Sequence, residues 1–130
     1  MLGNMAESVE RAVRIAVQPG DRLATPTGRG QFTLAQFSST GLVLLLGKKE
    51  AWTPLPWKAL EETPDLLRGR GWVPIGTTYS TTSSAGTLDA HLKGYLNRAT
   101  AAWVAVLLER AGVVAIDRSP PARVKLQRRW

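Results

Sequence analysis

The residues with the clearest chemical potential are the basic side chains at the C-terminal end of the chain. The segment 118–130 holds five of them and no acid: Arg118, Arg123, Lys125, Arg128 and Arg129. Guanidinium and ammonium groups bind phosphates, and each phosphate that they neutralise releases condensed counterions. Because the net charge is also +7, the pattern favours a polyanionic partner. A solvated basic tail that only aids solubility is the alternative.

Residues suited to catalysis are sparse. The chain has no cysteine, which excludes disulfides, thiolate zinc sites and cysteine nucleophiles. His91 is the one histidine, and its apolar neighbours Leu88 and Leu92 predict a partly buried helix residue rather than a base or ligand. The acids at 61, 62 and 65 are typical of a solvated face, and no segment matches a phosphate-binding P-loop. We therefore expect no enzyme activity, no cofactor and no metal site.

The five tryptophans raise the hypothesis of base stacking or an aromatic cage. At least three of them lie on apolar faces, which favours a role in the core. Trp52 and Trp57 flank a proline-bounded loop and are the best candidates for contact with a ligand.

The first half of the chain changes from helical to strand periodicity. An amphipathic helix is predicted over 5–17, and it can pack on its own domain or form a homodimer with a second copy. Residues 21–53 predict a small antiparallel β meander, with strands at 31–37, 42–46 and 50–53. The turn 27–30 carries one positive charge, which suggests a phosphate contact.

The second half begins with helix signals and ends in a basic ribbon. Proline at a first helical position, capping residues and glycine stops set most of the boundaries. The loop 77–86 is rich in hydroxyl groups that could donate to phosphates, or it is a plain surface loop. The expected elements are helices at 56–62, 63–68, 87–96 and 98–111, and strands at 72–75, 113–119 and 123–128, the last two joined through Pro120-Pro121-Ala122.

This order of helix, short strand, two helices and a two-stranded wing resembles the winged-helix family of DNA-binding domains over residues 56–129. The resemblance implies an α+β protein in which residues 1–53 extend a winged-helix domain at 54–130. It makes 98–111 the recognition helix in the major groove of double-stranded DNA and places the wing on phosphates or in the minor groove. The DNA-binding residues that it implies are Asn97, Arg98, Thr100, Ala101, Arg118, Arg123, Lys125, Arg128 and Arg129.

The helix 98–111 itself leaves two interpretations open. Trp103, Leu107 and neighbouring apolar residues fall on the core face, and the alanines 101, 102 and 105 fall opposite. Exposed alanines would let the helix approach a groove and touch a thymine methyl, or the methyl of a modified cytosine. A strip of small residues is equally typical of a helix buried against protein.

The sequence thus predicts a non-catalytic, double-stranded DNA-binding protein of the cytoplasm that associates with the nucleoid. It would be a transcription regulator, a nucleoid-associated protein or the recognition module of a DNA-processing system such as modification-dependent restriction. The alternative is a protein-docking or dimerisation module. The early acids Glu7 and Glu10 argue against a signal peptide, and the run 42–46 is too short to cross a membrane.

Overall fold

The computed structural model describes residues 8–76, 87–94, 100–128 and 130. They form a mixed α+β structure with two antiparallel sheets, as the sequence predicted. The expected loop at 77–86, residues 95–99 and the start of the predicted helix at 5–7 lie outside the described residues.

The first sheet is a four-stranded meander in the order β1-β2-β3-β4. It confirms the meander predicted for residues 21–53 and adds the short strand β1, which was not predicted. Phe32, Leu34 and Leu44 alternate with more exposed residues and are buried on its inner face. Gly41 is required where β3 meets β4, because a Cβ there would lie 2.2 Å from the Leu55 carbonyl oxygen. The strands are β1 Arg22–Ala24, β2 Gln31–Phe37, β3 Gly41–Leu46 and β4 Ala51–Pro56.

The second half contains helices and strands in the order that the sequence predicted. Its three strands form a sheet in the order β5-β7-β6. Most elements are shorter than expected, because their ends continue into turns. They are α2 Trp57–Glu61, α3 Thr63–Leu67, β5 Val73–Pro74, α4 Leu88–Lys93, α5 Ala101–Arg110, β6 Val114–Asp117 and β7 Arg123–Leu126.

Helix α1 (Val9–Ala16) packs on its own chain. Its apolar residues Val9 and Val13 are buried, and they face α2 and α5 within the same molecule. The Glu61 carboxylate at the end of α2 accepts hydrogen bonds from the main-chain N–H groups of Val9 and Glu10, at 2.9 and 3.0 Å, and from the Ser8 hydroxyl at 2.6 Å. Glu61 therefore caps α1 and is not part of a solvated acidic face.

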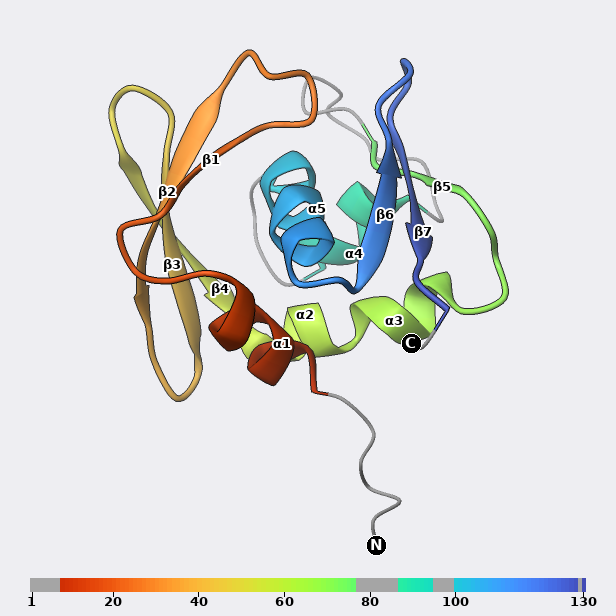
Figure 1. Ribbon diagram of the computed structural model, residues 1–130, viewed down its shortest axis with the longest axis horizontal. Coiled ribbons are helices and arrows are strands. Elements are labelled where there is room, and N and C mark those ends of the chain that lie inside the picture. Colours follow the sequence, from red (N-terminus) through yellow and green to blue (C-terminus); the bar gives the residue numbers. More distant parts are fainter. Residues whose placement is uncertain (1–7, 77–86, 95–99, 129) are drawn as a thin grey trace, which may run out of the picture.

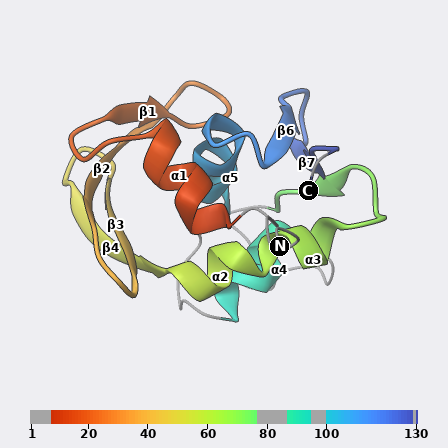
Figure 2. The ribbon, with the colours of Figure 1, turned by 60° about the horizontal axis from the view of Figure 1, so that its bottom comes forward.

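Helix α5 lies at the centre of the molecule, between the meander and the β6–β7 hairpin (Figures 1 and 2). It contacts α1 and β1 from the first half of the chain and α4 and β6 from the second. The expected boundary at 53/54 falls within β4, and residues from both sides of it share one hydrophobic core. The two halves thus pack as one unit around α5.

The position of α5 decides between the two interpretations of its alanine strip. Ala101 is 1% exposed and Ala105 is 0% exposed. The expectation that these residues form an open face was wrong, because α1 and the meander fold back over the side that faces away from the β5-β7-β6 sheet. The strip serves close helix packing, for which small side chains are suited.

Candidate nucleic-acid interface

The predicted DNA-binding residues fall into three groups in the structure. Thr100 and Ala101, at the start of α5, are buried and unavailable to a ligand. Their assignment to the major groove is therefore corrected by the packing of α5. The predicted residues Asn97, Arg98 and Arg129 lie outside the described residues. The four that remain are exposed, and they lie on the β6–β7 hairpin or just beyond it: Arg118, Arg123, Lys125 and Arg128.

Two of these arginines already pair with acids. Arg118 donates from both terminal nitrogens to the Glu109 carboxylate of α5, at 2.7 and 2.8 Å. These hydrogen bonds raise the pKa of Arg118 above its ordinary value. Arg123 donates to Asp117 at 2.6 Å across the hairpin. The pKa of Asp117 is lowered, first by the main-chain N–H of Ser119 and then by Arg123. The net positive charge of the hairpin is therefore smaller than residues 118–130 alone suggest.

A tryptophan joins the basic residues on the outer face of the β5-β7-β6 sheet. Val73 pairs with Val124, which places Trp72 beside Lys125 on the same face. The Arg123 guanidinium carbon lies 5.8 Å from the Trp72 ring centroid, and the Lys125 ammonium nitrogen lies 5.9 Å from it. Trp72 is 40% exposed. The cluster of Trp72, Arg123 and Lys125 is called the sheet patch below.

Only part of the sheet patch could be predicted from the sequence. Arg123 and Lys125 are two residues apart on a predicted strand, so their shared face could be foreseen. Trp72 was predicted on an edge strand, but its partner strand was not. The register between β5 and β7 is the signal that was missing.

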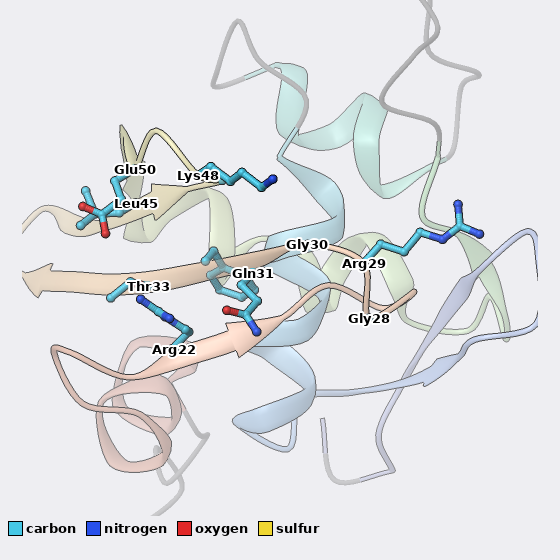
Figure 3. A pocket seen from close by; sticks show the side chains of 11 residues that line it. Arg22, Gly28, Arg29, Gly30, Gln31, Thr33, Leu45, Lys48 and Glu50 are labelled. Atoms are coloured by element: carbon cyan, nitrogen blue, oxygen red, sulfur yellow. The ribbon is translucent and has the colours of Figure 1, made fainter.

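A second basic surface lies on the outer side of the meander. It is an open groove of about 370 Å³, lined by Thr33 and Leu45 of the outer sheet face, by three cations and by one acid, Glu50. Figure 3 shows Arg22 on β1 beside Thr33 of β2, Lys48 on the turn after β3, and Arg29 extending away from the other labelled side chains. The cations are Arg22, Arg29 and Lys48. The positive charge predicted for the turn 27–30 thus lies at the edge of this groove.

No family model, curated protein or solved structure that was compared with the chain matches it.

Other residues singled out in the sequence have structural roles. Trp57 is buried, and its indole N–H donates to the Ser38 carbonyl at 2.8 Å. Arg14 lies over the Trp57 and Phe37 rings, 5.2 and 5.0 Å from their centroids. The ring nitrogen Nε2 of His91 lies 3.0 Å from the Ala59 carbonyl, and this residue is partly buried as predicted. Of the two tryptophans proposed for ligand contact, Trp52 alone stays accessible.

The described ranges contain no group of three or more histidine, aspartate or glutamate side chains placed to hold a metal ion. None of their helices has the length and apolar character needed to span a bilayer.

Proposed function

We propose that this protein is a non-catalytic double-stranded DNA-binding protein that contacts the phosphate backbone through the sheet patch. The observation that carries the proposal is the pairing of two exposed cations, Arg123 and Lys125, around one half-exposed indole. Arg128 follows on the same strand's extension and is exposed as well. The basic net charge of +7 supports the choice of a polyanion as the partner.

The geometry suits an anionic ligand. Arg123 and Lys125 each lie over the Trp72 ring, and these cation–π contacts help to order both side chains. Arg123 keeps its ion pair with Asp117, and among the described residues Lys125 and Arg128 supply the positive charge that no acid pairs. Release of the counterions condensed on DNA adds a further gain for each phosphate neutralised.

The winged-helix resemblance of residues 56–129 belongs to this proposal, with one change. In the family the second helix normally enters the major groove. Here α5 is covered by other parts of the chain, so we assign binding to the strands and not to the helix. Readout of base edges is then minor, and affinity depends mainly on the backbone. Cytoplasmic and nucleoid-associated roles, in regulation or in a DNA-processing system, fit such a contact.

The alternative of a protein-docking module has lost its main support. Of the alanine strip that would dock a partner, Ala101 and Ala105 are buried in the same chain and Ala102 is half-buried. The apolar face of α1 is likewise covered, and Ile15, at 72% exposed, is the one large hydrophobic residue of that helix left open. A single exposed aliphatic side chain is ordinary for a monomer.

Fluorescence anisotropy with a labelled duplex of about 20 base pairs tests the proposal. Lys125→Gln removes one exposed cation of the sheet patch, and Lys58→Gln removes an exposed cation from α2 as a matched control. At about 50 mM salt, we expect Lys125→Gln to weaken binding severalfold and Lys58→Gln to leave it within twofold of the wild type. Equal effects of the two variants would mean that the sheet patch is not the binding surface.

A further inference from the structure

The outer face of the meander carries one continuous row of four side chains. Arg22 pairs with Thr33, Thr33 with Leu45, and Leu45 with Trp52, one residue from each strand. Directly opposed residues of an antiparallel sheet point to the same face. The row therefore starts with a guanidinium group and ends with an indole, about 14 Å away at three strand spacings of about 4.8 Å.

Both ends of this row are accessible. Trp52 is 57% exposed, the highest value among the tryptophans of the described residues. Arg22 is exposed at the opposite edge, where it lines the groove. Trp52 thus presents an accessible indole on the same sheet face as Arg22.

The charge around the row is positive. Three cations line the groove, against the single carboxylate of Glu50. Among the described residues, Arg22, Arg29 and Lys48 form no ion pair. This differs from the β6–β7 hairpin, where two arginines are paired with acids. The groove cations are thus available to an anionic ligand without first breaking an internal contact.

We propose that this groove binds single-stranded nucleic acid across the meander, with phosphates on Arg22 and Lys48 and a base stacked on Trp52. A positive groove beside an exposed aromatic ring is the arrangement that tracks a strand without reading its sequence. A duplex does not fit the indole, because its bases are already stacked inside the helix. The site shares no residue with the sheet patch, so either proposal can fail while the other holds.

Anisotropy with a labelled oligothymidylate of about 12 nucleotides tests this site. Trp52→Ala should lower affinity roughly five- to hundredfold, because it removes a stacking partner. Arg22→Gln should reduce the dependence of log affinity on log salt by about 0.7. Arg11→Gln removes an exposed arginine from α1 and is the matched control, with no expected change. Because Arg11, Arg22 and Trp52 are all exposed, we expect each variant to fold, and thermal unfolding checks this.

The two nucleic-acid probes separate the sites. Arg22→Gln should weaken binding of the single strand and spare the duplex, whereas Lys125→Gln should do the reverse. Three results would overturn the inference: no binding of the oligonucleotide, affinities of Trp52→Ala and Arg22→Gln within twofold of the wild type, or an equal loss in Arg11→Gln. Full displacement by thymidine monophosphate at the same nucleotide concentration would also overturn it, since the groove would then be a mononucleotide site.

Discussion

Replacing Ala105 by leucine tests the central position of α5. Ala105 is fully buried, with α1, β1, α4 and β6 contacting its helix. Adding three carbon atoms to a packed site costs about 1–3 kcal/mol, because neighbouring side chains must shift. On an exposed helix face the same change would be close to neutral, since leucine ranks just below alanine in helix propensity. The substitution therefore separates the buried helix from the open recognition helix.

Urea denaturation followed by circular dichroism measures the effect. With a slope of about 1.5 kcal/mol per molar urea, a loss of about 2 kcal/mol lowers the midpoint by about 1.3 M. Ala102→Leu, at a half-buried position of the same helix, is the control and should shift the midpoint less. An unchanged midpoint for Ala105→Leu would refute the burial of Ala105 and favour an open alanine face on α5.

Three further predictions follow from the polar contacts. Glu61→Ala removes the acceptor of the Val9 and Glu10 N–H groups and leaves the Ser8 cap on Arg11. It should reduce the free energy of unfolding by about 1–3 kcal/mol, measured by urea denaturation. Asp65→Ala, which breaks an exposed ion pair, should cost under about 1 kcal/mol. Because the pKa of Asp117 is lowered from 3.8, its ionised form contributes stability above that pH, and this contribution is lost as the pH falls below it. Urea midpoints between pH 6 and pH 3 should therefore fall less for Asp117→Asn than for the wild type, and equal falls would contradict the assignment. Glu109→Gln frees Arg118 from its ion pair, so duplex binding should tighten and its salt dependence should steepen by up to about 0.9; unchanged binding would place Arg118 outside the interface.

Local patterns predicted the elements well, because helix and strand periodicity depends on near neighbours. The meander strands, the α1 face and the hairpin at 120–122 all follow from such patterns. Strand β1 was missed because three residues are too short to show alternation. The strands' outer faces were not predicted either, since the row from Arg22 to Trp52 exists only once the four strands are in register.

Whether α5 is exposed or buried could not be predicted from its own residues. Alanines at 101 and 105 suit an exposed strip and a tightly packed one equally well, and the choice depends on where α1 and β1 return in space. Similarly, the segment 118–130 contains no acid, but Asp117 lies one residue before it and pairs with Arg123. That pairing was not predicted. Contacts between distant parts of the chain, such as Glu61 with the start of α1, leave no local signal.

The affinity of the wild-type protein for duplex DNA, measured from about 50 to about 200 mM salt, tests the proposed function most directly. Engagement of Arg123, Lys125 and Arg128 predicts that log affinity falls with log salt with a slope of about −2 to −3, at about 0.9 for each phosphate contact. A slope near zero, or no duplex binding at the lowest salt, would contradict the assignment of the sheet patch to DNA.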